Sequence, residues 1–116
     1  MMTITQTKTD SSLTIALDGR LDTTSAPDLE AVCKNGLDGV SELTIDMEKL
    51  DYMSSAGLRV ILAMQKRMLE QGSMKVVNVN DIIMEIFEIT GFADILTIEY
   101  SYKKEQSSSR LAKGVL

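Results

Sequence analysis

The chain has 116 residues, of which 44% are hydrophobic and 25% are charged, and its formal net charge is -5. This length and balance are typical of one folded globular domain and exclude a disordered chain. The acidic balance argues against nucleic acid partners, because binding to phosphates depends on basic patches. Histidine is absent and cysteine occurs once, which excludes the commonest general base, an internal disulfide and a tetrahedral zinc site of these residues.

The common nucleotide-binding motifs and export signals are also missing from the sequence. It contains neither the GxxxxGK[ST] phosphate loop nor the GxGxxG fingerprint. No basic segment precedes a long apolar run, and no apolar run approaches the roughly 20 residues that cross a bilayer. We therefore expect a cytoplasmic protein without direct membrane insertion, and we expect no enzymatic activity, cofactor or metal.

Two strands are predicted at the N-terminus, followed by a helix. Residues 3–9 alternate weakly and residues 13–17 alternate clearly between apolar and polar, with a turn between them. The run TTSAPDLEAVCKNGLDG then has the features of a helix. Thr24 or Ser25 can be its N-cap, Pro27 lies in the first turn, and Gly36 or Gly39 marks the exit.

The second half of the chain continues the alternation of strands and helices. Residues 43–47 predict a strand, residues 48–51 an acidic loop, and the apolar spacing from residue 58 to 69 a helix that Gly72 ends. MKVVNV predicts a further strand. Asn80 or Asp81 can cap a third helix that Gly91 closes, and residues 95–100 predict the last strand.

This order predicts an α/β fold in a single domain over residues 1–100, with a mostly parallel sheet of four or five strands. The first strand is expected to enter antiparallel through a hairpin. Helices should lie mainly on one face, because residues 13–17 and 43–47 keep a polar residue at every second position. Residues 101–116 are rich in serine and lysine and predict a tail that is either a frayed helix or disordered.

The stretch DYMSSAGLRVIL, residues 51–62, places two serines at the expected start of a helix. A serine N-cap accepts a hydrogen bond from a backbone N–H of the first turn, which contributes roughly 0.5–2 kcal/mol. Gly57 costs about 1 kcal/mol against alanine in a first turn, which indicates a close approach of backbone or of a partner. A helix N-terminus also favours a phosphate on serine, because unpaired N–H groups and the positive dipole end meet its charge.

Three stretches resemble the STAS family, which comprises sulfate transporters and anti-sigma factor antagonists. GRLDTTSAPDLE looks like the family's first strand-to-helix loop, LTIDMEKLDYMSSAGLRVIL like its central motif, and EIFEITGFADILTIEY like its closing helix and strand. The resemblance covers residues 3–100 approximately. It implies a STAS-like fold and an anti-sigma factor antagonist, which is a protein-binding switch rather than an enzyme.

The resemblance also implies a site and its partners. The serine two positions before the Gly-Leu pair is the phosphorylated one in such antagonists, and here that position is Ser55, with Ser54 as the less favoured acceptor. The implied partners are an anti-sigma factor serine kinase, which the unmodified protein binds and the phosphorylated protein releases, and a PP2C-type phosphatase. The expected partner-binding residues are Asp22, Thr23, Thr24, Met53, Ser54, Ser55, Ala56, Gly57 and Arg59.

Other interpretations remain open beside this one. A constitutive STAS subunit of a bacterial lipid-transport ABC complex would use the same surface without a phosphate cycle. A serine hydrolase is disfavoured, because Met53 stands where the G-x-S-x-G elbow needs glycine and no histidine exists to activate Ser55. Asp18, Asp22 and Asp51 either ring the site or are simply solvated. Met53, Met64 and Met68 either form a contact surface or, in the case of Met64 and Met68, belong to the core.

Overall fold

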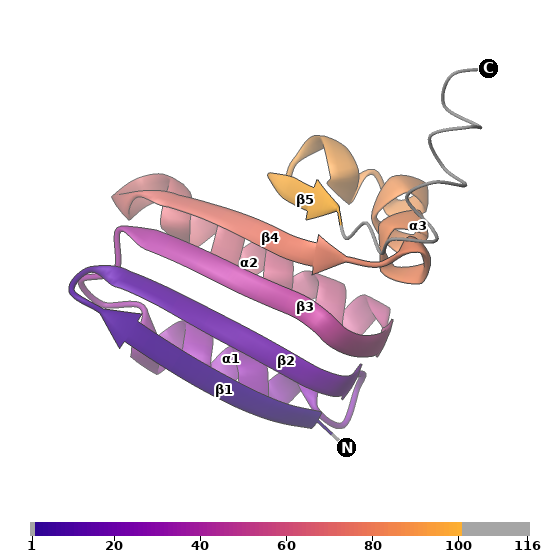
Figure 1. Ribbon diagram of the computed structural model, residues 1–116, viewed down its shortest axis with the longest axis horizontal. Coiled ribbons are helices and arrows are strands. Elements are labelled where there is room, and N and C mark those ends of the chain that lie inside the picture. The colour runs from indigo at the N-terminus through magenta and orange to yellow at the C-terminus, as the bar shows by residue number, and fades with distance from the viewer. Residues whose placement is uncertain (1, 101–116) are drawn as a thin grey trace.

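The computed structural model describes residues 2–100, which form a five-stranded sheet, three α-helices and one short 3-10 helix (Figure 1). The strands are β1 (Met2–Thr9), β2 (Ser12–Leu21), β3 (Glu42–Met53), β4 (Ser73–Val79) and β5 (Ile98–Tyr100). The helices are α1 (Ala26–Gly36), α2 (Ser55–Gln71) and α3 (Asp81–Thr90), with the 3-10 helix at Phe92–Asp94. The predicted tail, residues 101–116, lies outside the described residues.

The strands follow one another across the sheet in the order β1-β2-β3-β4-β5. β1 and β2 form an antiparallel hairpin through a two-residue turn, in which Asp10 adopts a φ of 54°. The pairs β2–β3, β3–β4 and β4–β5 are all parallel. The predicted α/β fold, the antiparallel entry and the mostly parallel sheet are confirmed.

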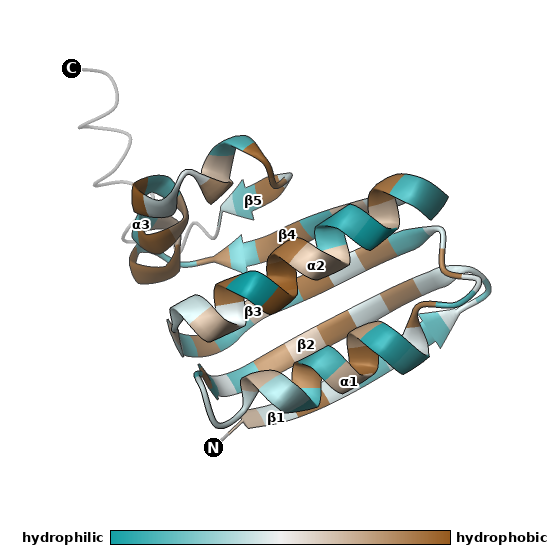
Figure 2. Ribbon diagram, turned by 180° about the vertical axis from the view of Figure 1, so that it is seen from behind, coloured by the Kyte–Doolittle hydropathy of each residue, from teal (hydrophilic) through white to brown (hydrophobic). Residues whose placement is uncertain are grey.

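The helices cover one face of this sheet. Figure 2 shows α1 and α2 side by side in front of the strands, and α3 lies beyond the end of β4. The opposite face is lined by polar side chains such as Thr14, Thr44 and Asp46, which are half-buried, because no helix lies over them. Alternation of buried and polar residues in β2 and β3 follows from this one-sided cover.

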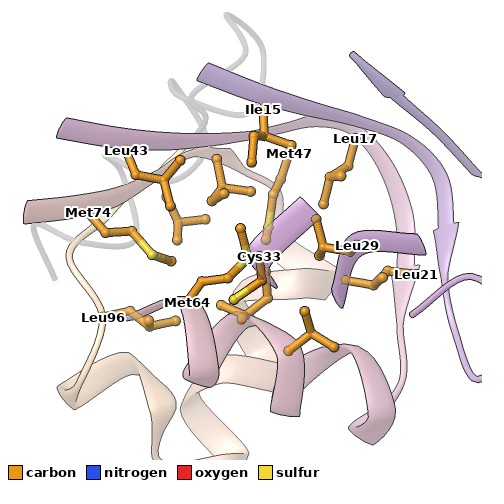
Figure 3. Close-up of a cluster of buried hydrophobic side chains, with 14 of the residues drawn as sticks. Ile15, Leu17, Leu21, Leu29, Cys33, Leu43, Met47, Met64, Met74 and Leu96 are labelled. Carbon is orange, nitrogen blue, oxygen red and sulfur yellow. The ribbon is translucent and has the colours of Figure 1, made fainter. Parts of the chain in front are cut away.

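The core lies between the sheet and the two long helices. Figure 3 shows side chains of Ile15, Leu43 and Met47 from the strands pointing toward Cys33 of α1 and Met64 of α2. Met64 and Met68 are fully buried, so they are core residues and not a contact surface. Burial raises the pKa of the Cys33 thiol and keeps it a small core residue.

β3 is longer than the sequence predicts, and this difference shapes the site. The expected acidic loop at residues 48–51 belongs to the strand, which runs on to Met53. Two register shifts against β2 insert extra residues into β3, so that Leu50 and Met53 are buried at a spacing of three. Alternation with period two is lost there, which is why the pattern predicts a loop.

Two smaller corrections concern element ends. The last strand begins at Ile98 and not at residue 95, because the 3-10 helix and a turn occupy the preceding residues. Ser25 stands at the N-cap position of α1 but its side chain does not cap the helix. The cap of α3 is Asn80, whose side-chain oxygen accepts a hydrogen bond from the Ile83 N–H at 2.9 Å. Gly91 ends α3 as predicted, and the structure places its backbone in the left-handed region.

Candidate functional site

The entrance of α2, by which we mean its N-terminus with the residues around it, lies against the ends of β3 and β2. The Ser54 N–H donates a hydrogen bond of 2.8 Å to the Leu21 carbonyl, which ties the start of α2 to β2. The backbone of Ser54 is extended, and its hydroxyl accepts a hydrogen bond from the Gly57 N–H at 3.4 Å. Ser54 is therefore the N-cap of α2, through a long and weak bond.

Ser55 is the first residue of α2 and its side chain is exposed. Within residues 2–100, its hydroxyl forms no hydrogen bond, in contrast to the half-buried Ser54. The two neighbouring serines thus differ in role, since Ser54 supports the helix and Ser55 faces solvent. A phosphate on Ser55 would extend away from the core and beside the N–H groups of the first turn.

Gly57 is required by the packing of the domain itself. A Cβ atom at this position would lie 2.5 Å from Leu21 Cγ and 3.1 Å from the Leu21 carbonyl oxygen. These distances are shorter than a van der Waals contact, so any other residue would push α2 away from β2. The close approach expected for Gly57 is therefore that of Leu21.

The loop between β2 and α1 lies next to this entrance and is held by a dense set of hydrogen bonds. An Asp22 carboxylate oxygen accepts hydrogen bonds from the N–H groups of Thr24 at 3.0 Å and Ser25 at 3.1 Å. The buried Ser25 hydroxyl donates to the Arg20 carbonyl at 2.6 Å and accepts from the Asp22 N–H at 2.9 Å. Hydrogen bonding by the Ser25 N–H, the largest effect, lowers the pKa of Asp22 below its ordinary 3.8.

α1 and α2 enclose an open hollow of about 260 Å³ beside the two entrances. Glu30 on α1 and Arg59 on α2 are the charged side chains that line it, so each wall carries one sign of charge. The other lining residues are Thr23, Ala26, Pro27, Ala56, Val60 and Ala63. The hollow brings the predicted residues Thr23, Ala56 and Arg59 together from two separate stretches of sequence.

Of the nine residues predicted to bind a partner, seven reach the surface. Thr23, Thr24, Ser55 and Arg59 are exposed, whereas Asp22, Ser54 and Ala56 are half-buried. Met53 and Gly57 are buried and lie behind the surface, where they position it. We call the seven residues at the surface the α2 entrance surface: Asp22, Thr23, Thr24, Ser54, Ser55, Ala56 and Arg59.

Arg20 and Tyr52 border this surface and were not predicted from the sequence. The Arg20 guanidinium carbon lies 4.4 Å from the centroid of the Tyr52 ring, and its Nε lies 3.8 Å from an Asp22 carboxylate oxygen. Tyr52 is 37% exposed. Their pairing depends on the shifted register of β2 and β3, which the residue pattern does not reveal.

Asp18 does not belong to this surface. Asp18 lines a hollow of about 250 Å³ on the open face of the sheet, together with Asp46 and Glu48. In the described part of the chain, no three acidic or cysteine side chains come close enough to hold a metal ion. The geometry offers a contact surface on which Ser55, at the first position of α2, presents an exposed hydroxyl.

Comparisons with known proteins identify relatives of this chain. The STAS domain family model matches residues 3–105. A Bordetella bronchiseptica protein that carries the name anti-sigma factor antagonist BtrV is 33% identical over 113 residues, which cover 96% of this chain and 97% of that protein.

Solved structures are similar over nearly the whole chain. An anti-sigma factor antagonist from Mycobacterium paratuberculosis has a TM-score of 0.78 at 19% identity, covering 94% of this chain and 93% of that one. The phosphorylated form of the Bacillus cell fate determinant SpoIIAA has a TM-score of 0.69 at 18% identity, covering 94% and 99%. At these identities the likeness shows the fold. No helix in residues 2–100 is long and apolar enough to cross a membrane.

Proposed function

Because the chain belongs to the STAS domain family, we propose that it is an anti-sigma factor antagonist that docks on its anti-sigma factor through the α2 entrance surface. The name of its Bordetella relative and the full-length coverage of that match support this role. The surface is assembled from two loops that hydrogen bonds and the Leu21 contact hold in place. Because this surface is already ordered before binding, docking loses less conformational entropy.

The same surface is proposed to carry a phosphorylation switch at Ser55. The observation that carries this proposal is the exposed Ser55 hydroxyl at the first position of α2, next to a Ser54 that serves as the cap. A kinase can reach this oxygen without unfolding the helix. Because Ser54 and not Ser55 accepts the capping hydrogen bond, modification of Ser55 leaves the helix start intact.

Phosphorylation would add negative charge to the docking surface. A phosphoserine adds a charge of about -1.5 to -2. Asp22 lies in the same surface, and Asp51 is exposed at the end of the adjoining strand. The added charge lies in the same surface as the Asp22 carboxylate and must be desolvated if a partner covers it. We infer that the unmodified protein binds the anti-sigma factor and the phosphorylated protein is released.

This switch needs two enzymes besides the antagonist. An anti-sigma factor with serine kinase activity would bind ATP and magnesium ions and transfer the phosphoryl group to the serine. A PP2C-type phosphatase would remove it. The antagonist contributes the hydroxyl and its presentation. No catalytic role is assigned to its own residues.

The test is phosphorylation by the cognate kinase with ATP and magnesium, followed by mass spectrometry of the intact and the digested protein. Wild type and Ser54→Ala should each gain one phosphate, located on residue 55, whereas Ser55→Ala should gain none. Ser54→Ala is the matched control, because it removes a neighbouring hydroxyl of the same kind. Labelling of Ser55→Ala to the extent of wild type would show that the acceptor lies elsewhere.

A further inference from the structure

The two edges of the sheet differ in how open they are to another strand. β1 forms one edge over eight residues, Met2–Thr9, and pairs with β2 in an unbroken register. β5 forms the other edge over three residues, and an ion pair between Lys75 and Glu99 at 3.5 Å lies beside it. A short and charged edge resists further pairing, whereas a long and regular edge invites it.

β1 has few of the features that normally protect an edge strand. It contains no proline, its pairing with β2 has no bulge, and Lys8 is its one charged residue. Thr3, Thr5 and Thr7 are exposed on the open face of the sheet, and threonine is a favoured strand residue. Within residues 2–100 β1 pairs with β2 alone, so one edge of its backbone stays available for hydrogen bonds.

The charge distribution along β1 is compatible with a second copy of this chain as the occupant. We propose that β1 pairs antiparallel with β1 of a second copy around a two-fold axis, which joins the two sheets into one. If the axis passes near Thr5, each Lys8 lies opposite the partner's Met2, and the two ammonium groups are about 20 Å apart along the strands. That separation exceeds the Debye length of about 8 Å, so their repulsion is largely screened.

Apolar side chains at the edge fit the same occupant. Met2 and Ile4 are half-buried against the core on the helix side of β1. Antiparallel pairing places Lys8 and Gln6 of one copy opposite Met2 and Ile4 of the other, where their aliphatic stems cover the exposed apolar atoms. The axis also places Thr3 opposite the second copy's Thr7, a cross-strand pair that stabilises sheets. The edge is therefore self-complementary, as a two-fold interface requires.

The edge used for this pairing is separate from the α2 entrance surface. That surface lies at the ends of β2 and β3 and at the start of α2, whereas β1 is the outermost strand (Figure 1). The proposal does not depend on the proposed function, because it concerns a different edge of the molecule.

The experiment is analytical ultracentrifugation of the full chain, without a tag at its N-terminus, over a wide range of concentrations. Two charge variants are compared with wild type: Thr3→Lys with Thr7→Lys, and Thr3→Glu with Thr7→Glu. Wild type should form dimers as the concentration rises. Each variant alone should raise the dimer dissociation constant at least tenfold, and an equimolar mixture of the two should recover dimers, because opposite charges then face each other across the axis.

The matched control is Ser73→Lys with Thr97→Lys, which has the net charge of the lysine variant but carries it near the other edge of the sheet. It should dimerise as wild type does. Hydrogen exchange serves as a second measurement, since amides of β1 should exchange more slowly as the wild-type concentration rises. A wild type that stays monomeric, a dimer that both charge variants retain, or β1 exchange that is independent of concentration would each overturn the proposal.

Discussion

The entrances of α1 and α2 lie side by side but are built in opposite ways. At α1, Asp22 and Ser25 hold the preceding loop with hydrogen bonds of 2.6–3.1 Å, and Ser25 is buried. At α2, one bond of 3.4 Å caps the helix, and Ser55 is exposed. The first entrance is organised for rigidity. The second leaves a hydroxyl and first-turn N–H groups open, as a modifiable site requires, and depends on close packing against Leu21.

The largest expected effect comes from breaking that packing. Gly57→Ala forces a Cβ against Leu21 Cγ and should lower the free energy of unfolding by about 2–3 kcal/mol, as overpacking does. Urea denaturation measures this. Gly36→Ala is the control, since its Cβ would meet its neighbours at 3.5 Å or more and should change stability by less than about 1 kcal/mol. Equal losses in both variants would show that the Leu21 contact does not set the requirement.

The next largest effect is expected from removing hydrogen bonds at the entrance of α1. Ser25→Ala leaves the Arg20 carbonyl and the Asp22 N–H without their buried partner and should cost about 1–2 kcal/mol of unfolding free energy. Thermal and urea unfolding give the value. The exposed Thr24→Ala, in the same loop, should change stability by less than about 0.5 kcal/mol. A Ser25→Ala protein as stable as wild type would contradict the contrast between the entrances.

The weak cap of α2 predicts a smaller loss. Ser54→Ala should cost about 0.5–1 kcal/mol, at the low end for N-caps because the bond is long. Ser55→Ala should stay within about 0.5 kcal/mol of wild type, because its side chain is exposed and has no internal partner among residues 2–100. The two single substitutions are compared by urea denaturation. If Ser55→Ala proves the more damaging, the roles of the two serines are reversed.

The smallest effect is the pH dependence that Asp22 confers. Its folded pKa lies below 3.8, so the ionised carboxylate stabilises the fold above the unfolded pKa, and this contribution is lost as the pH falls through the folded value. Wild type should be more stable than Asp22→Asn at neutral pH, and the difference should shrink below pH 3.8. Thermal unfolding across this range measures it. A difference that grows with acidity would have the wrong sign.

Much of the fold could be predicted from the sequence, because most strands and helices show a regular hydrophobic period and residues typical of their ends. Leu13, Ile15 and Leu17 alternate as a one-sided strand does, and Asn80 and Gly91 bound α3 as predicted. The extension of β3 to Met53 could not be predicted, since two register shifts replace the period of two with a spacing of three.

The candidate site was predictable in part, because several of its residues lie in continuous sequence motifs. Ser55 and Arg59 lie in one continuous motif, and Asp22 in another, so the motifs alone point to them. The stacking of Arg20 on Tyr52 and the presence of Glu30 in the hollow depend on how separate elements pack. Likewise, the sequence offered two candidate serines, and their separate roles follow from the backbone geometry at residue 54.

The most direct test of the switch is the affinity of the anti-sigma factor for the unmodified protein and for the protein phosphorylated on Ser55. Isothermal titration calorimetry gives both constants, and thermal unfolding checks that the modified domain stays folded. We expect the phosphorylated protein to bind about a hundredfold more weakly or worse, which corresponds to about 3 kcal/mol, with its fold intact. Equal affinity of the two forms, or loss of binding only because the domain unfolds, would contradict the account.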